Sequence, residues 1–197
     1  MMLSRSLIVA ISGATCSGKN TSARLIQKHL RSIPNTPPVN ILSQDKFYRP
    51  AEELAPVPGL KGNMKRWDEP SAVDWWQITK TLDTMTKTAN QVIVVEGNMV
   101  LLIDTILNRC DLAYMLTIPF KECARRRSQR TYAIKDEPGM LEKYVWPQSK
   151  EHLMLVRQKN TMGLIKFIDT EFLTSTDVSK FICYDILQLL NGDQTSK

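Results

Sequence analysis

Short apolar runs alternate along the chain with longer segments in which apolar residues recur every three or four positions. The runs are nearly continuous, which is typical of strands buried on both faces of a parallel sheet. The longer segments fit amphipathic helices that cross from the end of one strand to the start of the next. The pattern therefore predicts an α/β fold with a five-stranded parallel sheet flanked by helices. The predicted strands are residues 6–12, 39–42, 91–95, 111–118 and 164–168.

Polar residues and prolines mark where several helices begin. Ser71 and Asp74 have the spacing of a capping box, which predicts a helix that begins there. Thr174 and Asp177 are predicted to cap the last helix, and Pro119 suits the first turn of another. The other predicted helices are residues 19–31 and 148–161, and segments 50–63 and 133–147 are predicted to be loops. The last helix is predicted to face the core with Val178, Phe181, Ile182, Ile186, Leu189 and Leu190.

The first apolar run leads directly into a glycine-rich loop that matches G-x-x-x-x-G-K-[ST] except at its last position, Asn20. Glycines let backbone N–H groups face a bound anion, and Lys19 adds a charge that reaches the β- and γ-phosphates. The loop predicts ATP binding; the alternative is a plain Gly/Ser turn between a core strand and a helix. The predicted ATP-binding residues of this loop are Gly13, Ala14, Thr15, Cys16, Ser17, Gly18, Lys19, Asn20 and Thr21.

Asn20 stands where a phosphate-binding loop carries the hydroxyl that binds Mg²⁺, and Thr21 carries its hydroxyl one position too late. An amide oxygen can coordinate Mg²⁺. We therefore expect a Mg²⁺ site that includes Asn20 and that is weaker than one built on a hydroxyl.

Two carboxylates follow predicted strands, Asp45 after the second and Glu96 at the end of the third. Ligands of open α/β sheets bind beyond the carboxyl ends of the strands. Asp45 is therefore the candidate base for an acceptor hydroxyl, and Glu96 the acid that helps to hold the metal, with Lys19 completing the predicted catalytic set. Asp45 is also a candidate metal ligand. The alternatives are an aspartate that caps a turn and a glutamate paired with a lysine.

Four arginines cluster on the predicted helix after the fourth strand. They point to more than one helix face, so some are solvated, while two or three are expected over the triphosphate, where they stabilise transition-state charge. A solvated or nucleic-acid-binding face is the alternative. The cluster comprises Arg125, Arg126, Arg127 and Arg130.

Composition narrows the class of protein. The 197 residues, 43% hydrophobic and 23% charged, suit one domain over residues 1–197, with or without a small lid. The expected lid is the arginine-bearing segment at about residues 125–146. The formal net charge of +6 suits an anionic ligand such as ATP. The four cysteines lack metal or C-x-x-C spacing, and no stretch is long enough to span a membrane. The free cysteines favour the cytoplasm. We also expect a monomer with no nucleic-acid or membrane partner; the positive charge taken alone would also suit nucleic acid.

Trp67 and Asp68 precede the second predicted helix, where an aromatic ring beside a carboxylate can stack on a base and bind ribose hydroxyls. Taken together, the motifs resemble the nicotinamide riboside kinase family, from about residue 6 to the last helix. The resemblance implies the nucleoside/nucleotide-kinase type of P-loop fold and ATP-dependent phosphorylation of nicotinamide riboside in NAD salvage. It rests on residues 11–19 (ISGATCSGK), 42–48 (LSQDKFY), 66–68 (RWD), 95–97 (VEG), 116–132 (LTIPFKECARRRSQRTY) and 145–147 (VWP).

The same resemblance implies roles for individual residues. Asp45 would take the proton of the ribose 5′-hydroxyl, and Asp68 would bind the ribose diol. Trp67 and Tyr132 would hold the pyridinium ring between them, which suits a positively charged base. Arg127 would reach the base end of the substrate. The other implied contacts are Phe47 and Tyr48 with the nucleoside, and Arg126, Arg130, Asp169, Thr170 and Glu171 with ATP.

Two residues depart from the family pattern. Asn20 replaces a metal-binding threonine, which bears on Mg²⁺ affinity and turnover, and Asn98 replaces an apolar residue, which bears on packing. A uridine or cytidine kinase is the nearest alternative, and Trp67 and Tyr132 favour a cationic base over a pyrimidine. A nucleotide-binding protein that no longer catalyses is the other alternative, with Asn20 in its favour. Nicotinic acid riboside is left open as a second substrate.

Overall fold

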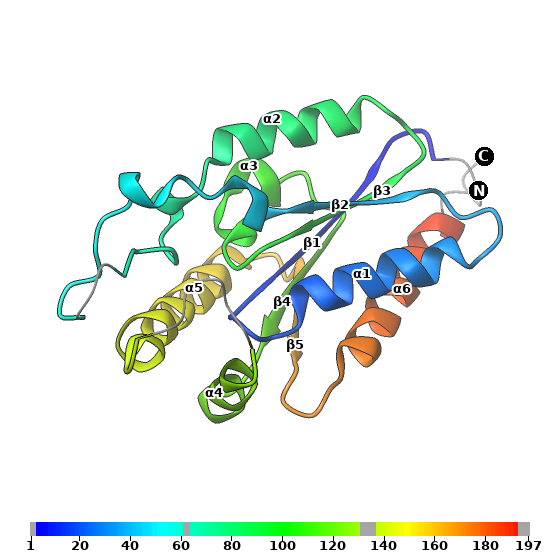
Figure 1. The fold of residues 1–197 in the computed structure, drawn as a ribbon. Helices are drawn as coiled ribbons and strands as arrows, with labels where there is room; N and C mark the ends of the chain where they lie inside the picture. Colours follow the sequence, from blue (N-terminus) through cyan, green and yellow to red (C-terminus); the bar gives the residue numbers. More distant parts are fainter. Residues whose placement is uncertain (1–2, 61–63, 131–136, 193–197) are drawn as a thin grey trace.

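The computed structural model describes residues 3–60, 64–130 and 137–192 (Figure 1). Its centre is a five-stranded sheet with the order β2-β3-β1-β4-β5, and all four ladders are parallel. This confirms the predicted fold class, and each strand begins and ends within one residue of its predicted range. The strands are β1 (Leu7–Gly13), β2 (Val39–Ser43), β3 (Val92–Glu96), β4 (Leu112–Thr117) and β5 (Ile165–Asp169).

Helices cover both faces of the sheet. α1 and α6 lie side by side on one face, whereas α2, α3 and α5 cover the other (Figure 1). α4 follows β4 directly, and 3₁₀ turns occupy Gln44–Phe47, Ala51–Glu53, Pro70–Ala72 and Val100–Leu102. The helices are α1 (Lys19–Arg31), α2 (Trp75–Thr86), α3 (Asp104–Leu107), α4 (Phe120–Ser128), α5 (Trp146–Lys159) and α6 (Ser175–Gly192).

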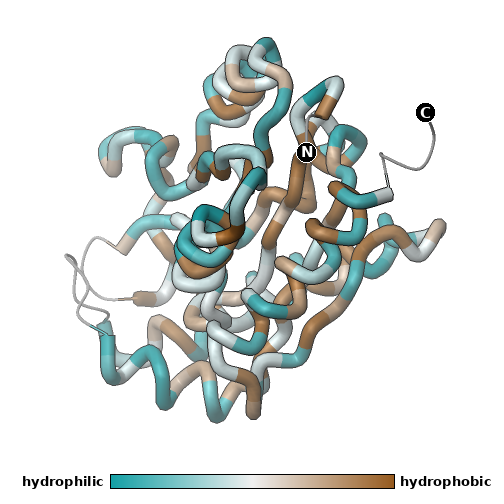
Figure 2. The backbone as a smooth tube through the Cα atoms, turned by 90° about the vertical axis from the view of Figure 1, so that its right-hand side faces the viewer, coloured by the Kyte–Doolittle hydropathy of each residue, from teal (hydrophilic) through white to brown (hydrophobic). Residues whose placement is uncertain are grey.

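Strand β1 explains why the apolar runs are continuous rather than alternating. All seven of its residues are buried. Val9 and Ile11 pack against α1 and α6, while Ile8 and Ala10 pack on the opposite face. Successive side chains of a strand point to opposite faces, so a strand with helices on both sides needs apolar residues at every position. Figure 2 shows hydrophobic residues along the central strands and hydrophilic residues on outer turns of the helices.

The start of α6 agrees with its predicted capping box. Thr174 Oγ1 accepts from the backbone N–H of Asp177, and the Asp177 carboxylate accepts from the backbone N–H of Thr174. The capping box predicted at Ser71 is wrong. Asp74 is itself the N-cap of α2, since its carboxylate accepts from the N–H of Gln77 at 3.0 Å, and Ser71 lies in the preceding 3₁₀ turn.

Other differences concern segments with little periodicity. The predicted loop 133–147 ends in a π-helix at Leu141–Val145 that runs directly into α5, so helical structure begins seven residues before Gln148. The 3₁₀ turn and α3 between residues 100 and 107 were not predicted. Phe181 and Leu189 of α6 are exposed, contrary to their predicted place in the core.

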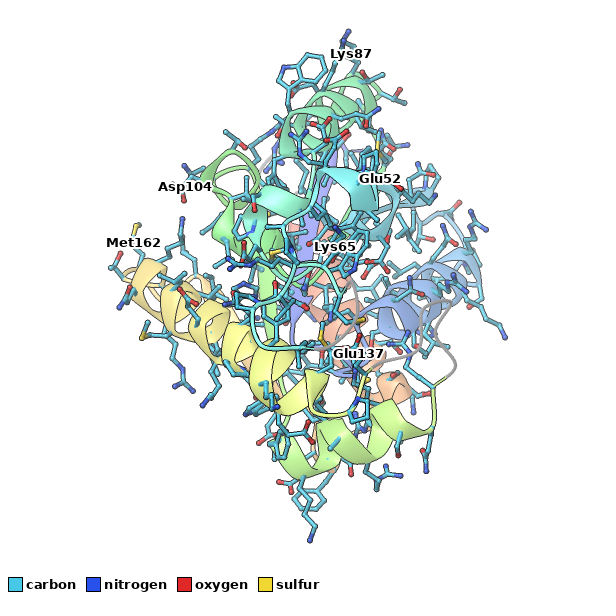
Figure 3. The ribbon with its side chains drawn as sticks, turned by 60° about the vertical axis from the view of Figure 1, so that its left-hand side comes forward. Glu52, Lys65, Lys87, Asp104, Glu137 and Met162 are labelled. Carbon is cyan, nitrogen blue, oxygen red and sulfur yellow. The ribbon has the colours of Figure 1, made fainter. Side chains whose placement is uncertain are left out.

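Two segments pack together beyond the carboxyl edge of the sheet. Val57 and Met64, which precede Trp67, join Met140, Leu141 and Tyr144 in a small apolar cluster. In Figure 3, Lys65 and Glu137 mark these two segments, which lie in front of the sheet in that view. The cluster thus holds the segment before Trp67 against the segment that leads into α5.

Candidate active site

The glycine-rich loop between β1 and α1 takes the conformation its sequence requires. Gly18 has a φ of +95°, and a Cβ there would lie 2.7 Å from Ser175 Oγ, so both backbone angle and space demand glycine. Cys16 has a positive φ of 60° although it is not glycine. The Lys19 ammonium bends back over the loop and donates to the Ala14 carbonyl at 2.7 Å. The loop that leads into α1 therefore has the positive charge of the Lys19 ammonium folded over it.

Lys19 lies among the predicted catalytic carboxylates. Burial lowers the pKa of Lys19, and the negative charges of Glu96 and then Asp45 oppose that shift. A triphosphate at this point would oppose it in the same way, because an anion favours the charged ammonium. Lys19 is thus placed to hold charge where a phosphate would bind.

Glu96, the last residue of β3, is 2% exposed and is held by residues from α1 and β2. Its Oε1 accepts from Asn20 Nδ2 at 3.3 Å and from Ser43 Oγ at the end of β2. The residue that departs from the P-loop pattern therefore contacts the predicted metal-supporting acid directly. Asp45, in the turn after β2, is exposed and lines the same pocket as Glu96.

The arginines of α4 are tied to the phosphate-binding loop and to the segment after β5. Arg126 donates to Glu122 and to the Thr170 carbonyl, both at 2.7 Å. Arg127 donates to Thr15 Oγ1 at 2.9 Å. Hydrogen bonds from Arg125 and Arg126 lower the pKa of Glu122 to about 2. Glu122 therefore stays ionised and orients two of the four arginines toward the pocket that they line.

The other end of the site carries aromatic and carboxylate groups. Trp67 meets Tyr48 edge to face, with ring centroids 5.5 Å apart and an interplanar angle of 86°. Burial, together with the charges of Asp68 and Asp45, raises the pKa of Tyr48. The Asp68 carboxylate accepts from Asn98 Nδ2 at 2.9 Å. Tyr132, the expected partner of Trp67, lies outside the described residues.

One pocket of about 870 Å³ joins both ends of the site. The expected site residues Gly13, Ala14, Ser17, Phe47, Asp169 and Thr170 are not among its lining residues. Ser17 and Thr170 are buried, and Phe47 packs against the core. The expected residues that line the pocket are Thr15, Cys16, Gly18, Lys19, Asn20, Thr21, Asp45, Tyr48, Trp67, Asp68, Glu96, Arg126, Arg127, Arg130 and Glu171.

Sequence reasoning missed several lining residues. Phe172 and Leu173 follow the expected ATP contact Glu171, and Phe172 is 90% exposed at the pocket. Their position directly after Glu171 was the available signal. Asn98, expected to bear on packing, also lines the pocket.

The oxygen donors fit Mg²⁺ bound together with a nucleotide. Asn20, Asp45 and Glu96 line the pocket beside Lys19. Among the described residues there is no group of three or more His, Cys, Asp or Glu side chains suited to a metal. Mg²⁺ does not need one, because it keeps several waters and binds through one or two carboxylates plus substrate phosphates. None of the helices in the described ranges is long and apolar enough to cross a membrane.

Comparisons with known proteins agree with this geometry. Human nicotinamide riboside kinase 1 is 32% identical over 160 residues, which cover 73% of this chain and 74% of that protein. The chain belongs to the nicotinamide riboside kinase family. A uridine kinase from Shewanella sp. (strain W3-18-1) is 27% identical over 64% of this chain and 69% of its own length. A scan of protein-family models gives no match.

Solved structures place the fold among the P-loop kinases. Thymidylate kinase from Candida albicans superposes with a TM-score of 0.60 at 15% identity, covering 95% of this chain and 93% of that chain. At this identity the likeness concerns the fold alone. The family membership, not the fold, identifies the protein as a nucleotide-binding kinase that acts on a nucleoside.

Proposed function

We propose that this protein transfers the γ-phosphoryl group of ATP to the ribose 5′-hydroxyl of nicotinamide riboside and so forms the mononucleotide in NAD salvage. Nicotinic acid riboside, which differs at the ring substituent, is proposed as a second substrate. Family membership supports this function, because the relatives at 28–32% identity are named for that substrate. We further propose that the protein works as a cytoplasmic monomer, with residues 125–146 as a lid over ATP.

The observation that carries the proposal is the continuity of the pocket. Lys19 and the arginines, the pair Trp67 and Asp68, and the candidate base Asp45 all line this one space. A kinase needs the phosphate donor and the acceptor hydroxyl side by side, with a carboxylate next to the hydroxyl. These residues supply each of the required chemical groups within a single cavity.

In the proposed reaction, Asp45 accepts the proton of the 5′-hydroxyl as its oxygen bonds to the γ-phosphorus. The bond between that phosphorus and the bridging oxygen of ADP breaks, and Lys19 and Arg126 hold the charge on the phosphates. Asn20, Asp45 and Glu96 would hold Mg²⁺, which supplies further charge neutralisation when bound. In this mechanism the protein mainly positions the two reacting groups and stabilises the negative charge on the phosphates.

Recognition of the base is proposed to depend on Trp67 and Tyr132. Tyr48 packs edge to face on Trp67 and so fixes the plane of that ring. A cationic pyridinium is attracted to an aromatic face, whereas a pyrimidine is read through hydrogen bonds at its edge. An aromatic binding site therefore favours nicotinamide riboside over uridine or cytidine.

Specific observations favour each of two competing functions. The uridine kinase relatives favour a pyrimidine nucleoside as substrate. The hydrogen bond from Asn20 to Glu96 favours a nucleotide-binding protein without catalysis, because it engages an acid that would otherwise support the metal.

A panel of acceptors tests the proposal. ADP release is measured with ATP and Mg²⁺ for nicotinamide riboside, nicotinic acid riboside, uridine and cytidine, in the wild type, Asp45→Asn and Asn20→Thr. We expect preference for nicotinamide riboside, a loss of at least 100-fold in kcat for Asp45→Asn, and a lower Mg²⁺ requirement for Asn20→Thr. Preference for uridine or cytidine would refute the proposed substrate. No turnover even in Asn20→Thr would favour the non-catalytic protein.

A further inference from the structure

We propose that Asn98 is a positioning residue that selects ribonucleosides by orienting the Asp68 carboxylate. This inference rests on the proposed function, in which Asp68 binds the ribose diol. Asn98 follows β3 and lines the pocket. Its Nδ2 donates to Asp68 Oδ1 at 2.9 Å, and its Oδ1 accepts from Gln44 Nε2 at 2.6 Å. Three side chains from different segments thus form one chain of hydrogen bonds, which we call the amide relay.

The direction of the amide relay is fixed by the backbone. The N–H of Met99 donates to Gln44 Oε1 at 3.0 Å, and a backbone N–H can only donate. Gln44 must therefore donate through its Nε2 to Asn98 Oδ1. The other end of the Asn98 amide, Nδ2, then faces Asp68 and donates to it. Since a carboxylate only accepts when ionised, every bond in the relay has its donor and acceptor correctly matched.

Gln44 is held too firmly to reverse its amide. It is 1% exposed, and its Nε2 also lies 3.2 Å from Tyr48 Oη as a donor. A Cβ on Gly97 would come within 2.4 Å of the Gln44 side chain, so glycine at this position is what admits the amide. Ser12 Oγ donates to the Asn98 backbone carbonyl at 3.0 Å and ties the relay to β1.

A neutral amide is suited to positioning a carboxylate that must bind hydroxyl groups. An arginine or lysine in the same place would fix Asp68 but would also neutralise its charge. Asn98 supplies one charge-assisted hydrogen bond and adds no positive charge, so the carboxylate can still accept from neutral donors such as the 2′- and 3′-hydroxyls of ribose. The proposal thereby explains why Asn98 is polar at a position where the family carries an apolar residue: its amide orients a carboxylate for ribose.

Two substitutions at Asn98 test this role. Asn98→Asp keeps an acceptor for Gln44 but sets a carboxylate against Asp68, and Asn98→Leu removes the amide at nearly constant size. The matched control is Asn40→Asp, because Asn40 Nδ2 donates to Gln91 Oε1 at 2.8 Å in a similar amide pair near the opposite ends of β2 and β3. Circular dichroism and thermal unfolding verify that each variant folds.

The readouts are kcat and KM for nicotinamide riboside against its 2′-deoxy analogue, KM for ATP, and nucleoside affinity by calorimetry with ADP bound. Uridine and 2′-deoxyuridine form a second pair. For Asn98→Asp we expect the KM and Kd of the ribonucleoside to rise about tenfold, with kcat within about twofold and KM for ATP unchanged. The preference for ribose over 2′-deoxyribose should fall, and Asn40→Asp should match the wild type.

The possible results separate the two proposals. Suppose that the wild type phosphorylates nicotinamide riboside and that both Asn98 variants keep its preference for ribose over 2′-deoxyribose. This result overturns the amide relay alone. An equal loss for ribose and 2′-deoxyribose also overturns it, since a general packing defect does not distinguish the sugars. If the wild type uses uridine instead, the proposed substrate fails and the uridine pair still tests the relay. A wild type that binds no ribonucleoside overturns both.

Discussion

Lowering the pH from 7 to 5 is expected to destabilise the protein through His152 on α5. This side chain is 4% exposed, and its Nε2 is buried with no hydrogen-bond partner among the residues that the structure describes. Burial lowers its pKa to about 4, while hydrogen bonding to the backbone of Asp68 acts in the opposite direction. His152 is therefore neutral in the folded protein throughout the range in which it becomes charged in the unfolded chain.

The size of the effect follows from the two pKa values. Well above pH 6.5, its ordinary pKa, His152 is neutral in both states and contributes no pH dependence. Below it the unfolded chain binds a proton that the folded protein excludes, so stability is lost as the pH falls toward 4. The full loss is about 3 kcal/mol, of which about 2 kcal/mol is reached by pH 5.

Urea unfolding followed by circular dichroism at pH 7, 6 and 5 measures this loss. Compared with the wild type, His152→Gln is expected to lose about 2 kcal/mol less between pH 7 and pH 5, whatever its stability at pH 7. His29→Gln, on the exposed side of α1, is the matched control and should keep the wild-type dependence. Equal pH dependence of His152→Gln and the wild type would refute the argument that burial keeps this imidazole neutral.

Three further predictions concern single contacts. Gly18→Ala forces a Cβ to 2.7 Å from Ser175 Oγ at a positive φ. We expect the free energy of unfolding to fall by about 2 kcal/mol in thermal unfolding, and ATP to bind more weakly in a titration. An unchanged melting temperature would contradict this. Glu122→Gln loosens the two arginines that it holds, and steady-state kinetics should show KM for ATP raised about threefold with KM for the nucleoside unaltered. Tyr114→Phe removes a hydroxyl that donates to Asp185 at 2.6 Å and should lower the urea-derived free energy of unfolding by about 1.5 kcal/mol; no change would show that this bond is energetically neutral.

The sequence identified the features that depend on local pattern. The five strands and the phosphate-binding loop were predictable because burial on two faces and a tight anion-binding turn each require particular residues at consecutive positions. The helix start at Asp74 was misplaced because Ser71 and Asp74 both have side chains that can cap, and only the chain path decides between them. The π-helix before α5 lacks the ordinary helical period, so its pattern resembled a loop.

The amide relay illustrates what the sequence could not supply. Asn98 looked like a departure from an apolar position, since no neighbour in the chain explains an amide there. Its partners Gln44 and Asp68 are 54 and 30 residues away. The pairing of β2 with β3 brings Gln44 to Asn98, and Asp68 reaches it from the segment that follows β2. Contacts that depend on strand order leave no local periodicity in the sequence.

The strand order has a consequence for how the chain can fold during synthesis. β1 and β2 are consecutive in the sequence but are not neighbours, because β3 lies between them and pairs with both. No ladder of the sheet can form until residues 92–96 have left the ribosome, so the apolar strand that leads to the phosphate-binding loop must wait for more than 80 residues of chain. Such delayed, non-local pairing slows folding and leaves apolar segments open to association. Nascent chains that stop before β3 would therefore be the form of this protein most dependent on chaperones.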